Sequence, residues 1–169
     1  MKKRLTIQRI VTLGVLIALN VVLARFLSLQ AWNIRIGFTF LTIVAAAIWY
    51  GPLEAAIVGG VGDLLGAILF PSGPFFPGFT LTAVLTGLVH GFLLHKKVTI
   101  PRILLSFGIV QFALGMVLNT FWISILYGKG FLATIPTRAA QAVLLFIIQS
   151  VLTYLLDAIL FKRVARVVA

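Results

Sequence analysis

The sequence predicts an all-α integral membrane protein, a compact bundle of six transmembrane helices forming a single domain over residues 1–169. Hydrophobic residues make up 62% of the chain and charged residues 10%, whereas a soluble domain carries roughly a quarter of its residues charged. The apolar residues also come in runs that approach the ~20 residues needed to cross a bilayer. Turn residues divide these runs into six segments.

The predicted helices cover residues 8–27, 37–50, 53–70, 78–95, 102–127 and 134–163. The first follows the basic residues 2–4, and no small-residue cleavage site comes after it, so we expect a retained span and no signal peptide. Gly51-Pro52 separates the second helix from the third, and proline and glycine in residues 71–78 separate the third from the fourth. Pro101 precedes the fifth helix, and Gly128 and Gly130 follow it.

The distribution of basic residues predicts the orientation. With six spans both termini lie on one side, and ten of the 14 Lys and Arg residues fall there: Lys2, Lys3, Arg4, Arg9, Lys96, Lys97, Arg102, Lys162, Arg163 and Arg166. Cytoplasmic loops are enriched in Lys and Arg, so we expect a multi-pass protein of the cell membrane with both termini cytoplasmic. The net charge of +11 then reports topology and contact with anionic lipids. The scattered basic residues form no patch for nucleic acid.

Four basic residues remain on the outer side, where the positive-inside rule does not require them. For Lys129, a solvated helix end and a functional role stay equally open. For Arg25, Arg35 and Arg138 we expect a basic mouth that receives an anion from outside.

The three acidic residues have different predicted roles. Glu54 begins the third helix, where a negative charge suits the helix dipole, and Asp157 lies a turn before basic residues near the membrane surface. Asp63 falls near the bilayer centre, where an ionised group needs a polar cavity or a partner. We favour a ligand-binding role for Asp63 over a structural hydrogen bond.

Further polar and aromatic residues are candidates for the same cavity. Asn119 and Trp122 are three residues apart and share a helix face. Several aromatics belong to the outer loops or their edges, where they either form an interfacial belt or fold over a flat ligand: Trp32, Phe75, Phe76 and Phe79.

Small residues recur four apart on several predicted helices, which lets helices approach closely in lipid. Most of these stripes are expected to pack inside the protein. Gly14 and Ala18 on the first helix are candidates for contact with a partner membrane protein.

Catalytic and metal motifs are absent from the sequence. The chain has no cysteine, no phosphate-binding Gly-x-x-x-x-Gly-Lys-Ser/Thr loop and no His-Glu-x-x-His motif. His90 and His95 are five residues apart and do not share a helix face well, so we expect no metal site and no cofactor.

Four segments carry a resemblance to a known family: residues 35–41 (RIGFTFL), Gly51-Pro52, residues 62–66 (GDLLG) and residues 76–83 (FPGFTLTA). In order and spacing they resemble the substrate-binding (S) component of energy-coupling factor (ECF) vitamin transporters, and most of all its folate-specific members. The resemblance implies a bundle that captures folate or a related pterin at the external face. It also implies a transmembrane coupling subunit and two cytoplasmic ATPases as partners.

This resemblance suggests roles for the polar residues. Folate carries a glutamate with two carboxylates, which suits the outer arginines, and a flat pterin, which suits aromatic side chains. A carboxylate such as Asp63 accepts two hydrogen bonds from an amino-pyrimidine edge. The alternatives are an S component for riboflavin or thiamine, a membrane-embedded lipid-modifying enzyme, and an assembly subunit. The dispersed acids argue against the enzyme, and an assembly role leaves Asp63 and the outer arginines unexplained.

Overall fold

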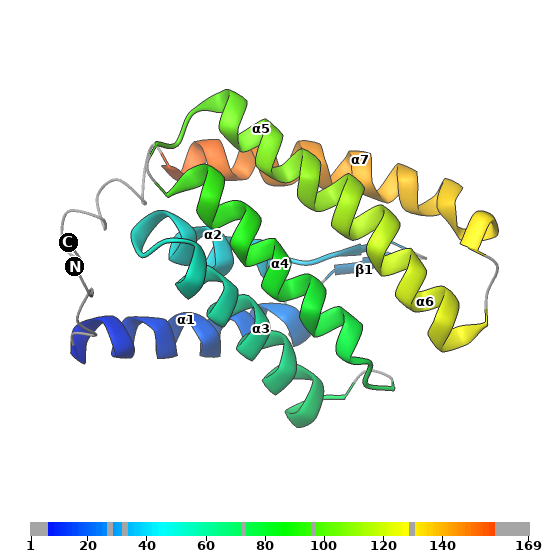
Figure 1. Ribbon diagram of the computed structural model, residues 1–169, viewed down its shortest axis with the longest axis horizontal. Helices are drawn as coiled ribbons and strands as arrows, with labels where there is room; N and C mark the ends of the chain where they lie inside the picture. Colours follow the sequence, from blue (N-terminus) through cyan, green and yellow to red (C-terminus); the bar gives the residue numbers. More distant parts are fainter. Residues whose placement is uncertain are drawn as a thin grey trace.

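The computed structural model describes residues 7–26, 29–31, 34–71, 74–95, 97–128 and 131–157. Within these ranges the elements, in chain order, are α1 (Ile7–Arg25), β1 (Leu29–Ala31), β2 (Ile34–Ile36), α2 (Phe40–Trp49), α3 (Pro52–Leu69), α4 (Pro77–Leu94), α5 (Ile100–Gly108), the π-helix η1 (Ile109–Leu118), α6 (Asn119–Tyr127) and α7 (Phe131–Leu156). The segments α5, η1 and α6 continue one another as a single rod (Figure 1). The described residues therefore form the six helical segments that the sequence predicts.

Successive helical segments run in alternating directions (Figure 1). We call the end where α1 and α6 finish and α4 begins the Arg25 end, and the opposite end, where α4 finishes, the His95 end. Among the described residues, five segments are long and apolar enough to cross a membrane: α1, α3, α4, the α5–η1–α6 rod and α7. The sixth, α2, has 10 residues and is only about 15 Å long.

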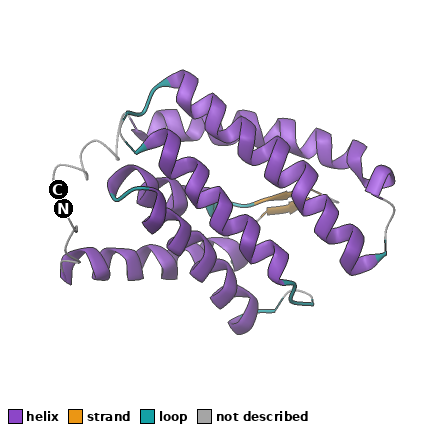
Figure 2. Ribbon diagram, in the orientation of Figure 1, coloured by secondary structure: helices purple, strands orange, loops and turns teal. Residues whose placement is uncertain are grey.

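A short hairpin between α1 and α2 departs from the helical expectation (Figure 2). Strands β1 and β2 pair antiparallel, with Leu29 opposite Ile36 and Ala31 opposite Ile34. The sequence predicts the second helix from residue 37, but α2 begins at Phe40. A strand of three residues is too short to give a period-two pattern that the sequence could reveal.

The α3 and α4 helices pack closely because glycines on their facing sides admit the neighbouring backbone. A Cβ added at Gly59 would lie 2.6 Å from the carbonyl oxygen of Ala83. One added at Gly87 would overlap the backbone of Ala55, and one at Gly91 the backbone of Pro52. These small-residue stripes thus serve internal packing, as in other membrane bundles.

Polar contacts attach α1 to the rest of the bundle at two levels. Near the Arg25 end, Asn20 Nδ2 donates to Thr42 Oγ1 at 2.7 Å and to the Thr39 carbonyl at 3.3 Å. At the His95 end, Arg9 forms an ion pair with Glu54 and lies over the Tyr50 ring. Glu54 lies in the first turn of α3, as the sequence predicts, and its ion pair with Arg9 is an additional structural contact.

The buried core lies around α2, whose residues from Thr42 to Ala47 are all buried. Phe40 meets Phe107 of α5 edge to face, with centroids 5.9 Å apart. Large apolar side chains on the outside of the bundle stay exposed, for example Ile10, Val15 and Phe92. An exposed apolar surface of this kind is expected where lipid, and not water, surrounds the protein.

Candidate functional site

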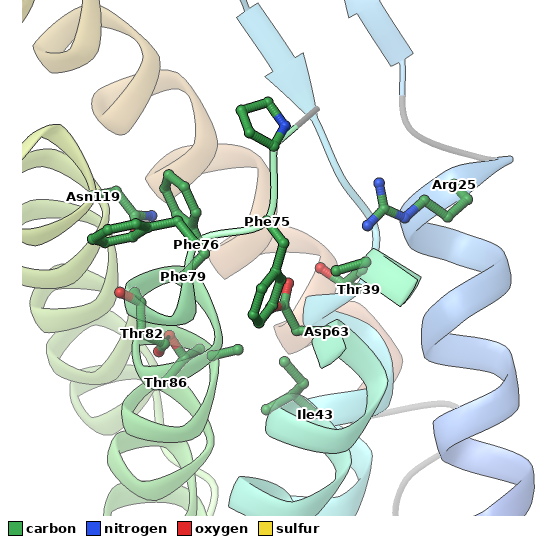
Figure 3. Close-up of a pocket in the computed structure, with 13 residues that line it drawn as sticks. Arg25, Thr39, Ile43, Asp63, Phe75, Phe76, Phe79, Thr82, Thr86 and Asn119 are labelled. Carbon is green, nitrogen blue, oxygen red and sulfur yellow. Dashed lines mark hydrogen bonds between the residues drawn. The ribbon is translucent and has the colours of Figure 1, made fainter. Parts of the chain in front are cut away.

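A cavity of about 440 Å³ opens at the Arg25 end of the bundle. We call it the outer cavity. Residues from α1, α2, α3, α4, the loop before α4, and α6 line it: Arg25, Thr39, Ile43, Asp63, Ala67, Pro74, Phe75, Phe76, Phe79, Thr82, Ala83, Thr86 and Asn119. In Figure 3, Arg25 and Asn119 lie on opposite sides with Phe75 between them, and Ile43, Thr82 and Thr86 lie deeper.

Asp63 contributes a carboxylate to this cavity from more than halfway along α3. Its Oδ2 accepts a hydrogen bond from Thr80 Oγ1 of α4 at 2.8 Å. Asp63 continues the stripe of Ala55 and Gly59, and therefore faces the same side of α3. The first two residues of that stripe pack against α4, while Asp63 reaches the cavity.

Arg25 brings a guanidinium from the last residue of α1. A Cβ added at Gly66 would lie 3.2 Å from Arg25 Nε, so the missing side chain at Gly66 makes room for the arginine. The position at the helix C-terminus also suits a cation. Arg25 and Asp63 are the charged residues among those that line the outer cavity.

Aromatic rings form the wall at the start of α4. Phe76 meets Phe79 edge to face, with centroids 6.1 Å apart, and its ring lies 5.6 Å from that of Trp122 on α6. Trp122 Nε1 also donates to Thr82 Oγ1 at 3.2 Å. Trp122 therefore supports Phe76 and Thr82 from behind, and it is not among the residues lining the outer cavity.

Asn119 joins the outer cavity to a smaller side cavity of about 100 Å³ between η1 and α7. Its Oδ1 is buried and has no hydrogen-bond partner among the described residues. Arg138 lines this side cavity, together with Gln111 and Gln141. Arg138 thus lies one cavity away from Arg25, with Asn119 between the two spaces.

Six of the residues that the sequence singled out line the outer cavity together: Arg25, Asp63, Phe75, Phe76, Phe79 and Asn119. Arg138 lines the side cavity. Arg35 lies on β2 opposite Gln30, and Trp32 lies outside the described residues.

The candidate partner residues occupy an exposed face of α1. Gly14 and Ala18 are both exposed, and a Cβ added at Gly14 would meet nothing within 4 Å. No group of three or more His, Cys, Asp or Glu residues suited to a metal ion occurs in the part of the chain that the structure describes.

Three threonines that line the cavity were missed by sequence reasoning: Thr39, Thr82 and Thr86. Thr82 Oγ1 donates to the Gly78 carbonyl at 3.0 Å, and Thr86 Oγ1 to the Thr82 carbonyl at 2.8 Å. Threonine hydroxyls commonly donate a hydrogen bond to a backbone carbonyl one turn earlier in their own helix. A threonine in an apolar helix therefore does not by itself indicate that it lines a cavity. Thr82 and Thr86 are four residues apart and so lie on one face of α4, and this spacing was the available signal.

Comparison with known proteins identifies the family. Residues 4–166 match the family described as "ECF-type riboflavin transporter, S component". The chain belongs to the S-component family of ECF-type transporters. This confirms the resemblance seen in the sequence, and the family membership together with the apolar helices makes the chain a multi-pass membrane protein.

Individual relatives of this S component carry a narrower name. The folate transporter FolT of Clostridium novyi (strain NT) is 40% identical over 140 residues, covering 82% of this chain and 81% of that protein. FolT of Leuconostoc mesenteroides is 31% identical over 160 residues, covering 90% and 86%. A crystal structure of FolT bound with folic acid matches with a TM-score of 0.80 and 36% identity, covering 88% of this chain and 90% of that one.

Proposed function

We propose that this S component binds folate, or a closely related pterin, at the Arg25 end and delivers it to an ATP-driven importer. The observation that carries the proposal is one cavity with Asp63 at depth, Arg25 at its rim and an aromatic wall between them. A flat ring with an amino-pyrimidine edge suits the carboxylate and the aromatics. A tail with two carboxylates suits the arginine.

The relatives support folate over other flat vitamins. Those named FolT share 40% and 31% of aligned residues with this chain, although the matching family description names riboflavin. Riboflavin is neutral and thiamine is cationic, so neither vitamin uses an arginine in the way that a carboxylate tail does. Arg25 beside the outer cavity and Arg138 beside the side cavity favour the anionic ligand.

We assign no catalytic role to the chain. Glu54 is paired with Arg9 at the His95 end, Asp63 lies in the outer cavity, and Asp157 follows the end of α7. These dispersed acids do not form the cluster that a lipid-modifying enzyme would need. Binding and delivery account for the same residues without a reaction.

Energy for transport would come from partner proteins. The family implies a transmembrane coupling subunit and two cytoplasmic ATPases, and the chain itself has no phosphate-binding loop. The exposed face of α1 around Gly14 and Ala18 is the proposed contact for the coupling subunit, because small residues allow close helix approach in lipid. The exposed apolar side chains of the other helices would contact membrane lipids.

The proposed location is the cell membrane, with the outer cavity facing outside and both termini in the cytoplasm. The bias of basic residues toward the side that carries both termini in the predicted topology supports this orientation. A reporter fused at Ala169 should show a cytoplasmic signal. An external signal would contradict the proposal that the outer cavity faces outside.

The binding proposal is tested by purifying the protein in detergent and identifying the copurified small molecule by mass spectrometry. Calorimetry of ligand-stripped protein with folate, riboflavin and thiamine then ranks the vitamins. We expect folate to bind at least ~100-fold more tightly than the other two, since it alone meets both the carboxylate and the arginine. Tighter binding of riboflavin or thiamine would overturn the assignment.

A further inference from the structure

A second polar cavity, of about 170 Å³, lies below the outer cavity, deeper in the bundle. We call it the annex. It lies among α2, α4, η1, α6 and α7, and its lining residues are Thr39, Phe40, Ile43, Thr82, Thr86, His90, Val110, Gln111, Gly115, Asn119 and Gln149. Five of these also line the outer cavity: Thr39, Ile43, Thr82, Thr86 and Asn119. The annex is therefore a continuation of the outer cavity.

His90 gives the annex a polar group with unused hydrogen-bonding capacity. The side chain is fully buried, and its Nδ1 lies 2.7 Å from Ser106 Oγ. Its Nε2 is buried and has no hydrogen-bond partner among the described residues. A neutral imidazole uses one ring nitrogen as donor and the other as acceptor. The contact with Ser106 accounts for one nitrogen only.

Two glutamines complete the polar lining at this level. Gln111 Nε2 of η1 donates to Gln149 Oε1 of α7 at 2.6 Å, which leaves the Gln111 oxygen and the Gln149 amino group for other partners. Gln111, Gly115 and Asn119 all line the annex at intervals of four residues. They lie on or directly after the π-helical segment, a distortion that is frequent at functional sites.

The annex has no charged residue of the Asp, Glu, Lys or Arg types among those that line it. It therefore suits a neutral group with alternating donors and acceptors and does not suit a carboxylate. His90 lines the annex, and leaving its covered Nε2 without a hydrogen-bond partner is costly; a ligand group that reached this nitrogen would remove that cost. Both features point to a ligand that hydrogen-bonds without carrying charge.

We propose that the annex is a second recognition subsite for the ring of the vitamin, separate from Asp63. The inference rests on the proposed function above. Thr39 and Ile43 line the outer cavity, the annex and the small cavity beside Asp63. A flat ring lying against these two residues can present one edge to Asp63 and another toward His90 and the glutamine pair. Ring carbonyl and ring nitrogen groups of a pterin supply neutral acceptors and donors that His90 and the two glutamines can match.

The test separates the ring from the tail of the ligand. Calorimetry would use folate, pteroate, which keeps the ring and lacks glutamate, and p-aminobenzoylglutamate, which keeps the tail and lacks the ring. The variants are His90→Leu and Gln149→Leu, each of which removes polar atoms from the annex. Ser106→Ala is the matched control, because Ser106 contacts His90 but does not line the annex.

We expect His90→Leu and Gln149→Leu to raise the dissociation constants of folate and pteroate about tenfold or more, since each removes a buried hydrogen-bonding partner. Binding of p-aminobenzoylglutamate should change less than about twofold, and Ser106→Ala should leave all three constants within about threefold. Unchanged pteroate binding in both annex variants would mean that water alone occupies the annex, which overturns the inference. An equal loss in Ser106→Ala would overturn it too, by showing that His90 acts only through packing. If the unmodified protein bound neither folate nor pteroate, the proposed function itself would fail.

Discussion

Replacing Asp63 by alanine tests the deepest polar contact of the outer cavity. Among the residues that the structure describes, Thr80 Oγ1 donates a hydrogen bond to this carboxylate at 2.8 Å. In the proposed complex it would also accept bonds from the amino-pyrimidine edge of the pterin. A hydrogen bond to a charged group contributes about 1.5–3 kcal/mol. Asp63→Ala should therefore weaken folate binding by about 2–3 kcal/mol, or roughly 30- to 150-fold.

Pteroate should lose as much affinity as folate, because it keeps the same ring. The stability of the ligand-free protein should change little. The variant loses the bond from Thr80, but it also removes a charge from the interior of a membrane bundle, and these effects oppose each other. We expect a melting temperature within about 4 °C of the unmodified protein, which corresponds to about 1 kcal/mol for a chain of this size.

Two further variants separate binding from folding. Asp63→Asn should give an intermediate affinity, because the amide keeps an acceptor but adds a competing donor. Thr80→Val removes the donor to Asp63 while leaving the carboxylate in the cavity, so it should cost less affinity than Asp63→Ala. Calorimetry with both ligands and melting of the ligand-free protein measure these effects. Unchanged affinity together with a large fall in melting temperature would refute the contact and make Asp63 a structural anchor.

Three other predictions address the rim, the partner face and the helix packing. Arg25→Ala should cost folate about 1.5–3 kcal/mol of binding and cost pteroate much less; equal losses in calorimetry would show that Arg25 supports the fold and does not bind the glutamate tail. Ala18→Leu should abolish cellular uptake of folate while the isolated protein still binds it; a parallel loss of both would place Ala18 in internal packing. Gly87→Ala should lower the free energy of unfolding by about 1–3 kcal/mol, because its Cβ would overlap the Ala55 backbone. Gly14→Ala, whose Cβ meets nothing within 4 Å, is the control, and an equal loss there would show that the close α3–α4 approach is not the cause.

The sequence was informative wherever a property is carried by neighbouring residues. Runs of apolar residues predict the helical segments, and proline and glycine predict their limits to within about three residues at most boundaries. The interior position of Asp63 also follows from counting along one helix. The hairpin β1–β2 and the π-helix η1 did not follow, because three-residue strands and a change in helical hydrogen bonding leave no distinct hydrophobic period.

Which polar residues share a cavity depended on how the helices are turned against one another. Gln111 and Gln149 are 38 residues apart in the chain and 2.6 Å apart in space, and no local pattern relates them. In a soluble protein the apolar stripe of a helix would show which face is buried. In lipid both faces are apolar, so the hydrophobic pattern reveals that a segment spans the membrane but not which side meets its neighbours. Here that rotation is set by the close approach of Gly59 and Gly87 to the facing helix, and it brings Thr39, Thr82 and His90 around one continuous polar space.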